Sequence, residues 1–157
     1  YPMDGLTFAR ALHVLGVVVW VGGLYFVTFI VLPVARTLSN QGEDGVDLFE
    51  KAERRFTFHA RVTVLLTGFS GFYMLHLLDA WERYLHIETW AVHAMTVLWL
   101  VFFLAVFIAE PLFLHRWFMQ KAAANPSGML RQAAIFHRLM IVWSLFTIAV
   151  AMFGAHA

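Results

Sequence analysis

Residues 10–24 read RALHVLGVVVWVGGL, an apolar run that holds one histidine, His13. No charged side chain follows Arg10 until Arg36. At about 1.5 Å of rise per residue, a helix of this length crosses the roughly 30 Å hydrocarbon core of a bilayer. The run therefore predicts a membrane-spanning helix over about residues 7–37, with a histidine inside it.

Three further apolar stretches follow, each bounded by charged or turn residues and each long enough to cross a bilayer, at about 56–79, 89–115 and 133–155. The connection Asn125-Pro126-Ser127-Gly128 is a strong turn signal, and the charged run 46–55 is expected to lie at the membrane surface. Short connections join antiparallel neighbours. We therefore expect an all-α membrane protein, a single domain over 1–157 that forms an up-down-up-down bundle of four transmembrane helices.

The composition supports the same class of protein. Of the 157 residues, 61% are hydrophobic and 13% are charged, where soluble chains have about a quarter charged, and the mean hydropathy is +0.72. A soluble protein of this size cannot bury that much apolar surface, and a net charge of +1 offers no basic field for nucleic acid. The absence of cysteine excludes disulfides, thiolate metal sites and cysteine nucleophiles. The bilayer is the expected partner, and nucleic acid is not.

Lysine and arginine predict the orientation, because the cytoplasmic side of a membrane protein holds the excess. Arg10 and Arg83 flank the outer ends of the predicted helices. The other nine flank the first and third connections: Arg36, Lys51, Arg54, Arg55, Arg61, Arg116, Lys121, Arg131 and Arg138. We expect an integral membrane protein of the bacterial inner membrane, with both termini in the periplasm.

Eight histidines form two layers when each is placed by depth. The outer layer holds His13, His76 and His93, with His86 and His156 beyond the helices, and the inner layer holds His59, His115 and His137. Ionisable groups in a membrane are expensive and usually face a site or a cavity. Taken one by one, each of these histidines also has a plainer interpretation, as a polar residue whose hydrogen bonds are satisfied near the interface.

A haem with two histidine ligands needs helices on opposite corners of a bundle, because neighbours pack only about 8–10 Å apart. His13 with His93 joins one diagonal at the outer level, and His59 with His137 joins the other diagonal at the inner level. These four histidines are the predicted haem-iron ligands. Two reserve ligands remain: His76, which points about 100° away from His59 on the same helix, and His115.

Several neighbours of these histidines are candidate haem contacts. Gly16 lies on the helical stripe of His13, where a small residue lets a flat macrocycle approach or, alternatively, lets two helices pack closely. Arg10, Arg61 and Arg138 each lie within three residues of a predicted ligand, and they either pair with haem propionates or act as positive-inside anchors. Glu110 is a candidate for proton uptake or quinone contact, and Arg36 or Arg116 is the expected partner if it is merely paired.

Two stretches carry a resemblance to a known family. The run from Arg10 to Leu24, with Pro33 at the end of the same helix, resembles the first helix of the copper-resistance protein D family and of its relative, the HemJ-type protoporphyrinogen oxidase. The stretch RVTVLLTGFSGFY at 61–73, with Leu-Thr-Gly at 66–68, resembles the next helix, and Trp90 matches the start of the third. The resemblance covers most of the chain, and it implies haem on His13 in one relative and copper handling in the other.

One position departs from the family pattern. Those families usually have a lysine a few residues after the tryptophan of the third helix, where this chain has His93. The histidine disfavours porphyrinogen oxidation and places a second imidazole opposite His13. The resulting two-layer plan is similar to that of the cytochrome b561 group.

The leading hypothesis is therefore a dihaem b-type cytochrome, with one haem b near each membrane face. It would carry electrons across the membrane between a quinone or cytochrome c-type carrier and a partner. It would act alone or as a subunit of a larger redox complex, such as one of the respiratory chain. No catalytic residues are predicted. The first alternative is copper transport or binding through Met3, His13, His76, His93 and Met95, since histidine with methionine suits Cu(I). The second alternative is HemJ-type protoporphyrinogen oxidation.

Overall fold

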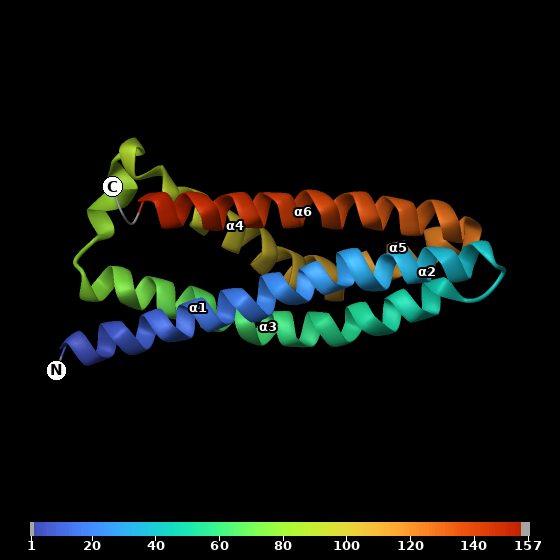
Figure 1. The fold of residues 1–157 in the computed structure, drawn as a ribbon, viewed down its shortest axis with the longest axis horizontal. Coiled ribbons are helices and arrows are strands. Elements are labelled where there is room, and N and C mark those ends of the chain that lie inside the picture. Colours follow the sequence, from blue (N-terminus) through green and yellow to red (C-terminus); the bar gives the residue numbers. More distant parts are fainter. Residues whose placement is uncertain (1, 155–157) are drawn as a thin grey trace.

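Four long helical segments run back and forth along one axis in the computed structural model, which describes residues 2–154 with side chains from Asp4 onward (Figure 1). His156 and the side chain of Met3 lie outside the described residues. No strand occurs between residues 2 and 154. The described ends of the chain lie at one end of the bundle, and the loop between α2 and α3 lies at the other. The first of these ends is called the outer end below, and the second the inner end.

The first segment is α1 (Pro2–Phe26), η1 (Val27–Val31) and α2 (Leu32–Asn40), and the second is α3 (Gly45–Leu77). Two short 3-10 turns, η2 (Trp81–Leu85) and η3 (Ile87–Thr89), form the outer connection. The third segment is α4 (Trp90–Leu104), η4 (Ala105–Leu114) and α5 (His115–Ala124), and the fourth is α6 (Pro126–Gly154). The all-α class is confirmed, and the four segments alternate in direction.

The inner ends of the helices extend further than expected. The second helix was expected to begin at about residue 56, and this boundary is wrong because α3 is continuous from Gly45 and includes the charged run 46–55. Asp44 caps that helix by accepting the backbone N–H of Asp47 at 2.9 Å. Asp47 in turn accepts Lys51 at 2.7 Å, a bond that raises the pKa of Lys51. Capping and ion pairs one turn apart thus give the charged run a helical conformation.

The turn between the third and fourth segments is shorter than expected. It was placed at about 120–131, but Asn125 alone separates α5 from α6. Asn125 caps α6 by accepting the backbone N–H of Gly128 at 2.9 Å, and Pro126 occupies the first helical position, where its missing N–H costs nothing.

Two π-helical turns accompany the prolines inside the long segments. η1 ends two residues before Pro33, and η4 contains Pro111. Proline has no backbone N–H, so a helix that continues through it leaves a carbonyl of the preceding turn without its partner. Wider π-turns are one way in which a helix accommodates such a break.

The bundle interior holds two apolar clusters. The central one is Trp20, Val21, Leu24, Val64, Leu98, Phe102 and Ile141, and the one nearer the inner end is Val27, Leu32, Ala35, Phe49, Leu130, Ala133 and Ala134. The Trp20 and Phe102 rings meet edge to face with centroids 4.7 Å apart. These two rings join α1 to the third segment. The central cluster as a whole takes side chains from all four segments, so side chains fill the centre of the bundle.

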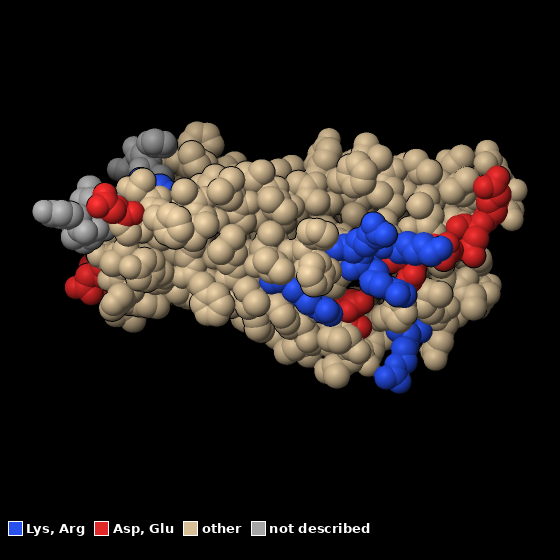
Figure 2. Space-filling model, turned by 90° about the horizontal axis from the view of Figure 1, so that it is seen from below, with Lys and Arg blue, Asp and Glu red and all other residues tan. Residues whose placement is uncertain are grey.

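Three segments are long and apolar enough to cross a membrane: Asp4–Asn40, Ile87–Ala124 and Pro126–Gly154. Most of their apolar side chains face outward, since only 17–39% of their most apolar stretches is buried inside the bundle. In Figure 2 the charged atoms on the visible face lie at the outer end and over the inner half, where basic side chains reach the middle of the molecule, and the region between these two groups is uncharged. A protein with this exterior is an integral membrane protein.

Candidate functional site

His13 lies on α1 with its ring against α3. Its Nδ1 donates to the backbone oxygen of Thr67 at 2.9 Å, and the hydroxyl of Ser70 lies 3.3 Å from the same nitrogen. Gly71 makes room for the ring, because a Cβ there would lie 3.2 Å from Cε1 of His13. A neutral imidazole that donates from Nδ1 carries its lone pair on Nε2. That is the arrangement of a histidine ligand whose other nitrogen is held by a carbonyl.

The buried polar atoms that have no hydrogen-bond partner among the described residues include Trp20 Nε1, Thr67 Oγ1 and Thr147 Oγ1. They come from α1, α3 and α6. Trp20 follows His13 by seven residues, so the two share a stripe of α1. A buried polar atom without a partner costs roughly 1–3 kcal/mol, so such atoms point to a bound polar group.

His93 lies in the first turn of α4, and its ring is turned to the outer connection. Nδ1 lies 3.3 Å from the Thr89 oxygen and Nε2 lies 3.1 Å from the Tyr84 oxygen. The Tyr84 ring also meets the imidazole edge to face, with centroids 5.6 Å apart. Because Nε2 faces a carbonyl, His93 would have to release Tyr84 before it could bind a metal.

The inner pair of predicted ligands lies in two different environments. His59 is exposed on α3, and its Nδ1 donates to the Arg55 oxygen at 2.8 Å. His137 is buried on α6, with Nδ1 on the Ala133 oxygen at 2.9 Å and Nε2 3.4 Å from Oε2 of Glu53. The structure therefore pairs His137 with Glu53, and it gives no support for an inner haem between His137 and His59.

The two reserve ligands lie at the surface. His76 is exposed near the outer end of α3. His115, at the start of α5, is also exposed, with Nδ1 3.9 Å from Oε1 of Glu50. No group of three or more histidine and acidic side chains arranged to hold a metal ion occurs within the described part of the chain.

The arginines predicted to bind propionates differ in their contacts. Arg10 and Arg138 are exposed on α1 and α6. Arg61 is committed elsewhere: its Nε donates to the Val106 oxygen at 2.9 Å, and its Nη2 lies 3.0 Å from Oε2 of Glu110. Glu110 thus pairs with Arg61, and the prediction that its partner is Arg36 or Arg116 is wrong.

Gly16 lies at a close contact between α1 and α3. A Cβ at this position would overlap the Thr67 hydroxyl and would lie 3.3 Å from the Thr63 oxygen. Of the two interpretations of this glycine, the structure shows the close helix contact. Its contact with a cofactor stays a prediction.

Sequence reasoning missed the groups that hold the predicted ligands. Thr67, Ser70 and Tyr84 contact His13 or His93, and Glu53 contacts His137. One signal was available, because Thr63, Thr67 and Ser70 are spaced four and three apart and so share a polar stripe of α3. A tyrosine carbonyl in the outer connection carries no such signal.

A pocket of about 540 Å³ lies at the outer end between the start of α4 and the end of α6, lined by Arg83, Glu88, Thr89, Trp90, Ala91, Val92, Val150, Phe153 and Gly154. Neither His13 nor His93 lines it. Comparison of the chain with protein-family models, with curated proteins and with solved structures found no match.

Proposed function

We propose that this protein is a membrane b-type cytochrome in which His13 is an axial ligand of one haem near the outer end. One observation carries the proposal: the Thr67 carbonyl holds Nδ1 of a half-buried imidazole at 2.9 Å and leaves the lone pair on Nε2. Buried Thr147 Oγ1, which lacks a protein partner among residues 2–154, supports a polar ligand in this half of the bundle.

The fit of the second ligand depends on the outer connection. His93 lies on the diagonal segment, six residues nearer the outer end than Trp99, which packs against Gly68 beside the Thr67 carbonyl that holds His13. It becomes a ligand only if its Nε2 gives up the Tyr84 carbonyl at 3.1 Å. The inner end does not fit, since Glu53 already faces His137. We therefore propose one haem, held by His13 and His93, rather than two.

Such a haem supplies a one-electron redox couple, and two histidine ligands leave no open position for a gas. The protein's own residues position and insulate it. Thr67 and Ser70 orient the His13 ring through Nδ1, and the central rings of Trp20 and Phe102 exclude water toward the inner half. The partners that fit are a quinone or a soluble carrier at the outer face, alone or within a larger redox complex.

The experiment is a pyridine haemochrome assay and a reduced-minus-oxidised spectrum of the purified full chain, with iron and copper measured on the same sample. The expected result is a b-type spectrum with about one haem per chain. Protein without haem contradicts the proposal, and copper without iron favours the copper-binding alternative. His93→Ala is expected to convert low-spin to high-spin iron in the electron paramagnetic resonance spectrum, because it removes one of two strong ligands.

The proposal also places all four segments across the membrane, with both termini outside. α3 is the fourth span: its outer half is apolar, and its polar stripe is buried against α1. The chain has no cysteine, so single cysteines report the topology cleanly. In intact cells a membrane-impermeant maleimide should label Leu85→Cys in the outer connection and spare Gln41→Cys in the α2–α3 loop. The reverse pattern would invert the orientation, and labelling at both positions would remove α3 from the membrane.

A further inference from the structure

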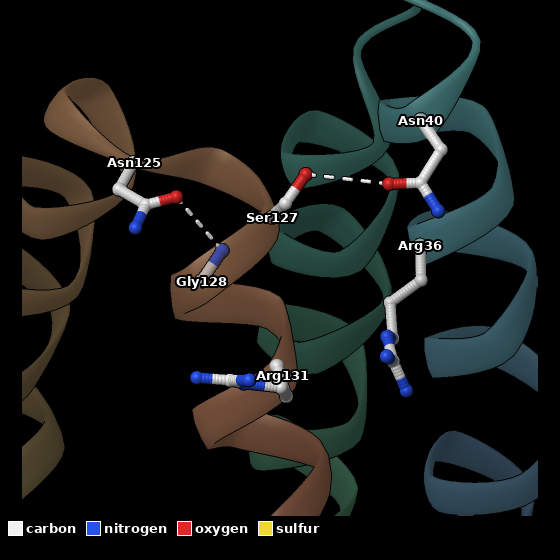
Figure 3. A pocket seen from close by; sticks show the side chains of 6 residues that line it. All are labelled: Arg36, Asn40, Asn125, Ser127, Gly128 and Arg131. Atoms are coloured by element: carbon white, nitrogen blue, oxygen red, sulfur yellow. Dashed lines mark hydrogen bonds between the residues drawn. The ribbon is translucent and has the colours of Figure 1, made fainter.

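A second pocket lies at the inner end, between the end of α2 and the start of α6 (Figure 3). Its volume is about 320 Å³, and it is lined by Arg36, Asn40, Asn125, Ser127, Gly128 and Arg131. Two of these six side chains are cationic and none is acidic. The lining therefore suits an anion, and it belongs to the end of the bundle opposite His13.

The guanidinium groups of Arg36 and Arg131 differ from other arginines of the inner half in their partners. On α3, Arg54 forms an ion pair with Glu50, and Arg61 forms one with Glu110. Arg36 and Arg131, by contrast, have no hydrogen bond or ion pair with any other residue in the described range 2–154. In Figure 3 both guanidinium groups lie below the bond between Ser127 and Asn40, that of Arg36 beside α2 and that of Arg131 on α6, extended away from Arg36. Two like charges lining one pocket repel each other, and a bound anion relieves that repulsion.

The polar residues around the arginines fix the shape of the pocket. Ser127 Oγ donates to Oδ1 of Asn40 at 3.4 Å, which joins α6 to α2, and Oδ1 of Asn125 caps the Gly128 N–H at 2.9 Å. Because Asn125 already satisfies that amide, the arginines are the groups left to bind an anion. The N-terminus of α6 adds the favourable end of a helix dipole.

An apolar stripe on α6 runs from this pocket toward the middle of the bundle. Ile135, Leu139 and Val142 follow Arg131 at spacings of four, four and three, and they are 52%, 61% and 65% exposed. On a helix that is apolar enough to cross a membrane, this stripe faces lipid tails. A phosphate at the arginines with an acyl chain on this stripe has the layout of a phospholipid.

We propose that this pocket binds the headgroup phosphate of an anionic phospholipid, with Arg36 and Arg131 as its charge-assisted donors and the Ile135–Val142 stripe against one acyl chain. Arginine suits this role, because its fork of N–H donors matches phosphate oxygens and basic pockets at the cytoplasmic side of membrane helices bind acidic headgroups. The site is independent of haem, so either proposal can fail while the other stands.

The test uses the full chain in detergent micelles. The unfolding midpoint is followed by circular dichroism during titration with dioctanoylphosphatidylglycerol. Dioctanoylphosphatidylcholine, which has the same tails and no net charge, and inorganic phosphate are titrated in parallel. The variants are Arg36→Gln and Arg131→Gln. The matched control is Arg116→Gln, which changes an exposed arginine on α5 outside the pocket.

Phosphatidylglycerol is expected to raise the midpoint of the wild type and of Arg116→Gln, with an affinity about tenfold lower in either pocket variant. Equal stabilisation by phosphatidylcholine, or unchanged affinity in both pocket variants, overturns the site. Stabilisation by inorganic phosphate at the same concentration overturns the lipid as its occupant. If a pocket variant fails to fold, native mass spectrometry of Arg131→Lys decides: reduced co-purified phosphatidylglycerol supports the proposal, and wild-type levels contradict it.

Discussion

Arg61 donates from Nε to the backbone oxygen of Val106 at 2.9 Å, and that oxygen lies five residues before Pro111. In a π-turn the carbonyl of residue 106 would accept the N–H of residue 111, which proline lacks. The arginine of α3 therefore supplies the hydrogen bond that the proline of η4 removes. Glu110, one residue before the proline, holds the same guanidinium at 3.0 Å.

This relationship predicts a coupling between two positions on different helices. Arg61→Met should destabilise the protein by about 1–3 kcal/mol, because it leaves the Val106 carbonyl and Glu110 without a donor. In a Pro111→Ala background, where residue 111 regains its N–H, the same substitution should cost about 1 kcal/mol less. Denaturant unfolding of the two single variants and the double variant in micelles measures this difference. Additive effects would show that Arg61 acts only through Glu110.

The contact between α1 and α3 predicts a contrast between two glycines of one helix. Gly16→Ala brings a Cβ against the Thr67 hydroxyl and the Thr63 backbone, so it should lower stability by about 1 kcal/mol or more. Gly22→Ala is the control, since its Cβ meets nothing within 4 Å and alanine favours helix, and it should be neutral or stabilising by up to about 1 kcal/mol. Equal thermal shifts for the two variants would contradict the packing described for Gly16.

Alanine substitutions of the two inner histidines, His137 and His59, should lower the stability of the protein by different amounts in the same unfolding measurement. His137→Ala removes a buried ring and leaves Oε2 of Glu53 buried without its nearby imidazole, so it should cost about 2–4 kcal/mol. His59→Ala removes an exposed ring and should change stability by about 0.5 kcal/mol or less. Neither substitution should change the haem content. Loss of half of the haem in both variants would restore the inner site that the sequence predicted.

The helices were predictable because their signal is long and repeated. An apolar run such as 10–24 leaves the backbone few alternatives inside a bilayer, and short polar connections determine the direction of the next helix. The inner helix ends were not predictable to the residue. Asp44 and Asn125 read as loop residues in a polar stretch, and their capping role depends on backbone geometry that composition does not specify.

The candidate site was predicted only as a set of depths. Counting residues places His13 and His93 at similar levels, but ring orientation is decided by the nearest acceptor. For His13 that acceptor is the Thr67 carbonyl on the neighbouring helix, and for His93 it is the Tyr84 carbonyl. Both are backbone atoms, so no residue type in the sequence marks them. The Arg61 contact with Val106 escaped prediction for the same reason.

The most direct test of the account is the haem-to-protein ratio of His13→Ala beside that of His76→Ala, both purified in the same detergent. His76 is the matched control, because it is an exposed histidine of the outer half. If His13 is an axial ligand, His13→Ala loses the haem, while His76→Ala keeps the wild-type ratio and spectrum. An unchanged ratio in His13→Ala, or equal loss in both variants, would contradict it.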